Sequence, residues 1–180
     1  MNTKGKIVNF KLPSTSYERP MTISGETAIL HSWIHDNTEK KVNHSRSTSM
    51  ISDALIRCEK NKKPKIIGIE GSTRSGKTIL AKILHSSGSN TELVDVCSLM
   101  NNLAERVYLS PVKDLTKAYI VDEAGFVDSK SLLSTVKNLI DKGKVVVLLF
   151  QSKKDIDSSI LKNMSYFNLS RKHGLTAIET

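Results

Sequence analysis

Long apolar runs are missing from this sequence of 180 residues, and none approaches the ~18 residues that a membrane-spanning helix needs. The first residues include Lys4 and Lys6, but no apolar stretch of the kind found in secretion signals follows them. Cysteine is also scarce, and no metal-ligand spacing surrounds Cys58 or Cys97. We therefore expect a cytoplasmic protein with no membrane span and with two reduced, mostly buried thiols.

Acidic residues are outnumbered, with 18 Asp and Glu against 27 Lys and Arg, so the formal net charge is +9. This balance predicts a polyanionic partner, nucleic acid first and DNA before RNA, with solubility alone as the alternative explanation. Aromatic residues make up only 5% of the chain, so binding is expected to be directed at the phosphate backbone rather than at stacked bases. Candidate contacts are Lys40, Lys41, Arg46 and the lysines of residues 60–63.

Residues 1–64 are expected to form a basic N-terminal extension, with 11 Lys and Arg against 6 Asp and Glu. Its pattern predicts a short strand at Lys6–Leu12, a helix at Gly25–Asp36, a polar loop over 35–49 and a second helix that starts at Ser49. Such an extension could contact a protein partner or serve as an oligomerisation arm.

From residue 65 onward, apolar segments alternate with amphipathic ones, which predicts a parallel sheet with right-handed crossovers. The expected strands are 65–70, 91–97, 118–121, 144–150 and 166–169. The expected helices are 76–85, 99–108, 129–142 and 156–164, the third of them ending at Gly143. A turn at 172–174 could return the chain through 175–178.

The segment Gly71-Ser-Thr-Arg-Ser-Gly-Lys-Thr78 has the spacing G-x-x-x-x-G-K-[ST]. It leaves an apolar strand and enters an amphipathic helix, so loop N–H groups and the helix N-terminus are expected to surround a β-phosphate. Lys77 would reach the β- and γ-phosphate oxygens, and the Thr78 hydroxyl would hold Mg²⁺. The residues expected to contact ATP are Gly71, Ser72, Thr73, Arg74, Ser75, Gly76, Lys77, Thr78 and Ile79.

Polar residues also end two of the later strands. Asp122 and Glu123 follow the strand at 118–121, at the end of the sheet where ligands bind in open α/β folds. Asp122 is expected to hold the Mg²⁺ water shell, and Glu123 to polarise a water for attack on the γ-phosphate. Gln151 follows the strand at 144–150 and is expected to orient that water, with an ordinary surface glutamine as the alternative.

A whole strand, 91–97, separates the loop strand from the acidic strand along the chain. This spacing matches the division of P-loop ATPases that has an added central strand and a catalytic glutamate, with sheet order 5-1-4-3-2 counted from residue 65. The expected fold class is therefore an α/β P-loop NTPase. Its core, residues 65–180, would be a five-stranded mostly parallel sheet flanked by helices, and residues 1–64 would be a small helical extension.

Three stretches resemble the FtsK/HerA superfamily of DNA-pumping ATPases, which includes the coupling ATPases of conjugation. They are "GSTRSGKT", "IVDEAGF" and "VVVLLFQSKKDID", and the likeness covers about residues 65–165. Arg74 departs from the pattern because this family usually has glycine there. The chain is also much shorter than a typical motor of the family, which implies a compact relative from a plasmid, phage or other mobile element.

The resemblance further implies a homo-oligomeric ring in which one subunit donates an arginine to its neighbour's nucleotide. Arg171 is the first candidate for that arginine and Arg106 the second, and either could instead be an ordinary surface residue. Arg74 could contact phosphate within its own chain.

These observations predict a Mg²⁺-dependent ATP hydrolase that acts on or beside nucleic acid, in DNA transfer, maintenance or packaging by a plasmid or phage. Its working residues would be Lys77, Thr78, Asp122, Glu123 and Gln151. One alternative is a small-molecule kinase of the nucleoside type, although the segment at 151–165 supplies no arginine for a lid. The other is a nucleotide-binding switch or assembly factor that does not hydrolyse.

Overall fold

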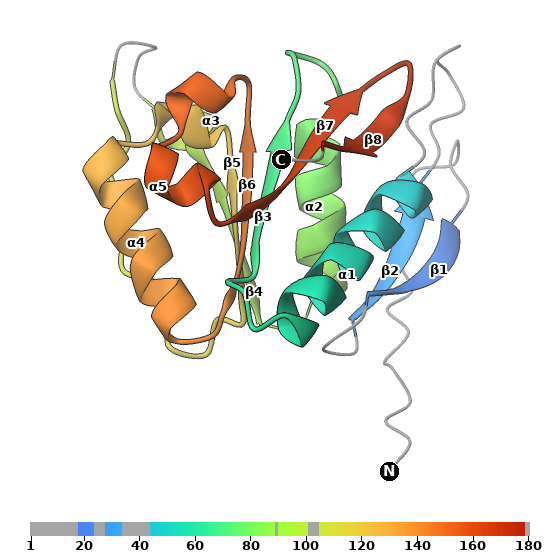
Figure 1. Ribbon diagram of the computed structural model, residues 1–180. Helices are drawn as coiled ribbons and strands as arrows, with labels where there is room; N and C mark the ends of the chain where they lie inside the picture. The colour runs from blue at the N-terminus through green and yellow to red at the C-terminus, as the bar shows by residue number, and fades with distance from the viewer. Residues whose placement is uncertain (1–17, 24–27, 34–43, 89, 101–104, 179–180) are drawn as a thin grey trace.

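A six-stranded sheet, parallel except for its last strand, forms the centre of the molecule (Figure 1). The computed structural model describes residues 18–23, 28–33, 44–88, 90–100 and 105–178. The strands of the sheet are β3 (Ile66–Glu70), β4 (Thr91–Asp95), β5 (Ala118–Asp122), β6 (Val145–Phe150), β7 (Met164–Ser170) and β8 (Gly174–Ala177). The helices of four or more residues are α1 (His44–Lys60), α2 (Lys77–Ser87), α3 (Val96–Leu99), α4 (Ser129–Asp141) and α5 (Ser158–Leu161).

The order across the sheet is β4-β5-β6-β3-β7-β8. The five parallel strands thus follow the predicted order 5-1-4-3-2, but the predicted count of five strands is one too low. The additional strand, β8, pairs antiparallel with β7. Its return is made by a tight turn that ends at Gly174, whose φ of +68° suits glycine, and Leu175 is then buried in the core. The α/β class with a mostly parallel, helix-flanked sheet is confirmed.

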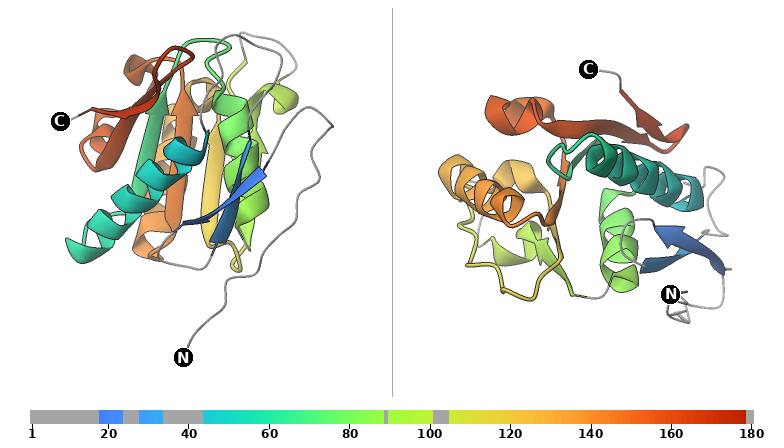
Figure 2. Two further views of the ribbon diagram at one scale, coloured as in Figure 1. Left: turned by 90° about the vertical axis from the view of Figure 1, so that its right-hand side faces the viewer. Right: turned by 60° about the horizontal axis from the view of Figure 1, so that its bottom comes forward.

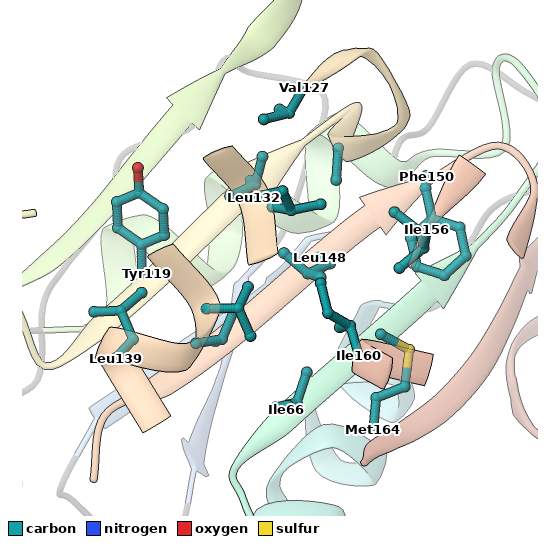
Figure 3. Packing of buried hydrophobic residues seen from close by; sticks show 14 of the residues in the cluster. Ile66, Tyr119, Val127, Leu132, Leu139, Leu148, Phe150, Ile156, Ile160 and Met164 are labelled. Atoms are coloured by element: carbon teal, nitrogen blue, oxygen red, sulfur yellow. The ribbon is translucent and has the colours of Figure 1, made fainter. Parts of the chain in front are cut away.

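The sheet separates two layers of core. One cluster lies under α4 and α5, and Figure 3 shows part of it; the other lies under α1 and α2, on the opposite face (Figure 2). β6 serves both layers, because successive side chains of a strand point to opposite faces. Val146, Leu148 and Phe150 join the first cluster, while Val147 and Leu149 join the second. This explains why the sequence of β6 is continuously apolar.

Helix α4 matches its prediction closely. Asp128 caps its N-terminus by accepting a hydrogen bond from the backbone N–H of Ser131 at 2.9 Å. Leu132, Val136 and Leu139 recur with helical spacing and are buried. Gly143 follows the helix with a φ of +69°, as predicted for a glycine just past a helix end.

The N-terminal part differs from its prediction. The expected helix at Gly25–Asp36 is wrong, because Ala28–Trp33 is a strand, β2, that pairs antiparallel with β1 (Glu18–Ile23). Short apolar segments cannot be assigned to helix or strand by periodicity alone, and here a neighbouring strand supplies hydrogen-bond partners. The expected loop over 35–49 is wrong over its last residues, since α1 already begins at His44.

Helix α1 packs directly against the sheet. Its Ile51 and Ala54 are buried in the same cluster as Ile67 of β3, and the β1–β2 hairpin lies against α1 and α2. The boundary at residue 64 stays a prediction. The expected strand at Lys6–Leu12 lies outside the described residues, as do Lys40 and Lys41.

The expected helix at 99–108 is also wrong, at Met100 and over 105–108, while 101–104 lie outside the described residues. α3 ends at Leu99, and Val107 instead forms a parallel bridge with Val127. The backbone of Val107 exchanges hydrogen bonds with Phe126 and Asp128 at 3.0 and 2.9 Å, and its buried side chain joins the core. A burial partner distant in sequence therefore overrides the local helical pattern. None of the helices in the described ranges is long and apolar enough to cross a membrane.

Candidate functional site

The segment from Gly71 to Thr78 lies at the carboxyl end of β3, at the top of the sheet in Figure 1. The backbone N–H of Gly71 donates to the carbonyl of Phe150 at 3.1 Å, which fastens the start of the loop to β6. A Cβ on Gly71 would lie 2.7 Å from the carbonyl oxygen of Leu169. Gly76 has a φ of +100°, a conformation that residues with a side chain rarely adopt. Glycine is therefore favoured at both positions: a Cβ at 71 would be too close to a neighbouring carbonyl oxygen, and the backbone at 76 has a positive φ.

Lys77 opens α2, and only 4% of its surface is exposed. Its ammonium group donates to the carbonyl oxygens of Gly71 at 2.8 Å and Ser72 at 3.2 Å. It also lies 3.4 Å from Oε1 of Glu123, at the end of β5. A buried ammonium needs such partners, because an unpaired buried charge is costly. The lysine thus connects the loop to the acidic strand.

Glu123 and Gln151 face each other across neighbouring strand ends. Nε2 of Gln151 donates to Oε2 of Glu123 at 3.2 Å, and the Thr73 hydroxyl lies 3.5 Å from Oε1 of Gln151. Thr73, Gln151, Glu123 and Lys77 therefore form one connected series of side chains, which we call the polar chain. Glu123 itself has φ +60° and ψ +47°, a left-handed conformation that non-glycine residues adopt mostly where function or tight packing requires it.

Asp122 is the last residue of β5, directly before Glu123, and is only 3% exposed. Burial raises the pKa of its carboxyl group, while a side-chain hydrogen bond with Thr78 acts in the opposite direction. Its Oδ1 has no hydrogen-bond partner among the described residues. An unpartnered carboxylate oxygen beside a hydroxyl fits the ligand preference of Mg²⁺, a hard cation that binds oxygen.

No group of three or more His, Cys, Asp or Glu residues that could enclose a metal ion occurs in the part of the chain described. A magnesium ion held by Thr78 and Asp122 would therefore take its other ligands from water and from phosphate oxygens. This is how Mg²⁺ ordinarily binds, because it loses its waters reluctantly.

Arg74 occupies the left-handed region, with a φ of +63°, and is exposed. Glycine would adopt this conformation more easily, so the backbone does not account for the arginine at this position. Nε of Arg171 donates to the carbonyl oxygen of Arg74 at 2.5 Å, so Arg171 contacts the loop of its own chain. Arg106 donates to the carbonyl of Gly125. The role of either arginine toward a neighbouring subunit stays a prediction.

Substitution of Arg74 tests the backbone of this loop. Arg74→Val is expected to lower the free energy of unfolding by about 1–2 kcal/mol, because a β-branched side chain is strained at this φ. Arg74→Asn, the matched control, should cost under about 0.5 kcal/mol, since asparagine tolerates the left-handed region. Urea unfolding measures both values. Equal stability of the two variants would show that the loop does not hold this conformation.

Sequence reasoning missed a pair of residues that support the loop. Glu70, the last residue of β3, accepts hydrogen bonds from the Tyr166 hydroxyl and, at 3.1 Å, from the backbone N–H of Lys153. Burial, followed by the hydrogen bond and charge of Glu70, raises the pKa of Tyr166 above its usual range. The ring of Tyr166 also packs beside Phe150, with centroids 6.1 Å apart. The one available signal was a charged residue ending an otherwise apolar strand, directly before Gly71.

Removal of the Tyr166 hydroxyl is expected to weaken this support. Tyr166→Phe should lower the free energy of unfolding by about 1.5–3 kcal/mol, the range for hydrogen bonds to charged groups. Tyr108→Phe is the control, because Tyr108 is exposed and should change stability by under about 0.5 kcal/mol. Denaturant unfolding at neutral pH compares the two, and similar losses in both variants would contradict the assigned role of Glu70.

The two thiols differ from each other. Cys58 is buried, as predicted, but the prediction is wrong for Cys97, which is exposed beside the site. Val96 is the buried residue of α3, and the side chain of the next residue, Cys97, is exposed. Partial burial and the nearby charges of Glu123, Asp95 and Asp122 raise the pKa of Cys97, so its thiol stays protonated.

Comparison of the sequence with models of protein families and with curated proteins finds no match to either. The geometry of the site is therefore the evidence on function. It brings together the predicted residues Thr73, Lys77, Glu123 and Gln151 in the polar chain, with the pair Thr78 and Asp122 beside them.

Proposed function

We propose that this protein is a Mg²⁺-dependent ATP hydrolase that acts on or beside nucleic acid, in DNA transfer, maintenance or packaging by a mobile element. The polar chain carries the proposal: a buried lysine, a carboxylate and an amide from three separate segments meet above the end of a parallel sheet. Chemistry of this kind needs a cation at the phosphates, a base near the attacking water and a group that orients this water.

In the proposed reaction, loop N–H groups and the N-terminus of α2 bind the β-phosphate. The ammonium of Lys77 moves to the β- and γ-phosphate oxygens and stabilises charge there. Glu123 polarises the attacking water, and the amide of Gln151 orients it. Thr78 and Asp122 would hold Mg²⁺, which would supply positive charge to the phosphate oxygens.

The contact between Lys77 and Glu123 links the Gly71–Thr78 segment to the proposed catalytic carboxylate. At 3.4 Å, each charge partly neutralises the other. When phosphate oxygens take over the lysine, the carboxylate is released to accept a hydrogen bond from water.

The test is a measurement of ATP turnover by the whole chain with Mg²⁺ or with EDTA, in the presence and absence of single- and double-stranded DNA, alongside molar mass with ATP bound. We expect turnover that requires Mg²⁺, increases with DNA and accompanies assembly of more than one subunit. ADP that forms only when a nucleoside acceptor is added would indicate a kinase instead. Tight binding of ATP without turnover, even with DNA, would indicate a switch or assembly factor.

A further inference from the structure

The amino ends of the parallel strands form the edge of the sheet at the bottom of Figure 1, opposite the Gly71–Thr78 segment. Backbone hydrogen bonds align the residues that precede the strands. Val146 donates to the carbonyl of Lys65 at 2.9 Å, and Val145 donates to that of Lys117 at 3.0 Å. Adjacent strands lie about 4.8 Å apart, so the connections that enter β5, β6, β3 and β7 follow one another in a row about 15 Å long.

These connections are strongly basic. We call residues 57–65, 90–92, 113–117, 141–144 and 162–163 the amino edge. Its ten basic residues are Arg57, Lys60, Lys62, Lys63, Lys65, Lys113, Lys117, Lys142, Lys144 and Lys162. Its four acidic residues are Glu59, Glu92, Asp114 and Asp141. Ten against four leaves an excess of six positive charges, most of the formal +9 of the whole chain.

The opposite edge has no such excess. Its basic residues, at the carboxyl ends of the strands and in the loops beside them, are Arg74, Lys77, Arg106, Lys153, Lys154, Arg171 and Lys172. Its acidic residues are Glu70, Asp95, Glu105, Asp122, Glu123, Asp128, Asp155 and Asp157. The positive charge is therefore concentrated on the edge away from the proposed nucleotide site.

Ordinary structural roles explain part of this excess. Lysines in or just after the last turn of a helix interact favourably with its dipole, which accounts for Lys60, Lys142 and Lys162. Lys65 pairs with Glu59 at 3.6 Å, and Lys144 donates to the carbonyl of Asp114 at 2.7 Å. Lys62, Lys63 and Lys113 are exposed, and neither an ion pair nor a hydrogen bond of this kind is assigned to their side chains.

We propose that the amino edge binds the phosphate backbone of duplex DNA, on the side of the sheet opposite the nucleotide. The choice of nucleic acid as the partner rests on the proposed function, and the surface that binds it is the new inference. A row of positive groups about 15 Å long suits a linear polyanion with one charge per about 1.7 Å of axis. Leu115, 80% exposed, is the one exposed large apolar side chain found here among the described residues. Single strands need aromatic stacking, and membranes need an apolar face, so duplex DNA fits best.

Two triple variants with the same net charge test this surface. The amino-edge triple is Lys62→Gln, Lys63→Gln and Lys113→Gln. The control triple is Lys82→Gln, Lys130→Gln and Lys137→Gln, on α2 and α4. All six lysines are exposed, so both triples should fold.

Binding to a short fluorescent DNA duplex is followed by anisotropy over a range of KCl concentrations. We expect the amino-edge triple to raise Kd at least about tenfold and to flatten the slope of log K against log salt by about 2–3. The control triple should change Kd less than about twofold.

Equal losses in both triples would overturn the proposal, because net charge alone would then explain binding. Unchanged binding by the amino-edge triple would also overturn it, as would tighter binding to phosphatidylserine vesicles than to DNA. Failure of the proposed function is read separately, from ATP turnover by the unaltered chain. If the unaltered chain hydrolyses no ATP but only the amino-edge triple binds DNA more weakly, the proposed DNA-binding surface is supported and the proposed ATPase activity is not.

Discussion

Replacement of Glu123 by glutamine is expected to lower the turnover of ATP by at least about a hundredfold, the contribution typical of a general base. The amide has nearly the same shape as the carboxylate but cannot polarise water as a base. Binding of ATP should stay within about threefold of the unaltered protein or become tighter, because Lys77 loses the carboxylate that lies 3.4 Å away in the free site.

Steady-state release of phosphate and calorimetric binding of ATP to the same sample measure the two effects. Asp53→Asn is the matched control, since it removes one negative charge at an exposed position on α1, outside both the site and the amino edge. Its turnover should equal that of the unaltered chain. Undiminished turnover by Glu123→Gln would remove Glu123 from the mechanism.

Lys77→Ala is expected to abolish both binding and turnover, with a loss of at least about a hundredfold in kcat/KM. The ammonium is buried and held by the carbonyl oxygens of Gly71 and Ser72, so it already lies at the loop before nucleotide arrives. No other lysine of α2 can replace it, because Lys82 is exposed more than one turn further along the helix.

Lys82→Ala is therefore the control for Lys77→Ala, and it should leave kcat/KM unchanged. The same two assays separate the roles of the two site residues: Glu123→Gln should lose turnover alone, and Lys77→Ala should lose binding as well. A Lys77→Ala variant that still binds and hydrolyses ATP would contradict the proposed function as a whole.

Local patterns predicted much of this fold, because most strands of the sheet and the main helices beside it adopt the structure that their own residues favour. The apolar run of β6 indicated burial on both faces, and both core clusters contain its residues. The capping residue and the periodicity of α4 are likewise local. Where a local pattern was short or ambiguous, as at Ala28–Trp33, pairing with another segment decided the structure.

By itself, the sequence determined which residue types end the strands, and so the chemistry that the site contains. Only the tertiary structure decided which of them meet. Gln151 contacts Glu123 across 28 positions of sequence and Thr73 across 78, and Tyr166 contacts Glu70 across 96. The physical reason is that a parallel sheet aligns strand ends by hydrogen bonds between backbones, and the order of strands depends on burial of the whole core. The same alignment gathers lysines from separate connections into the amino edge.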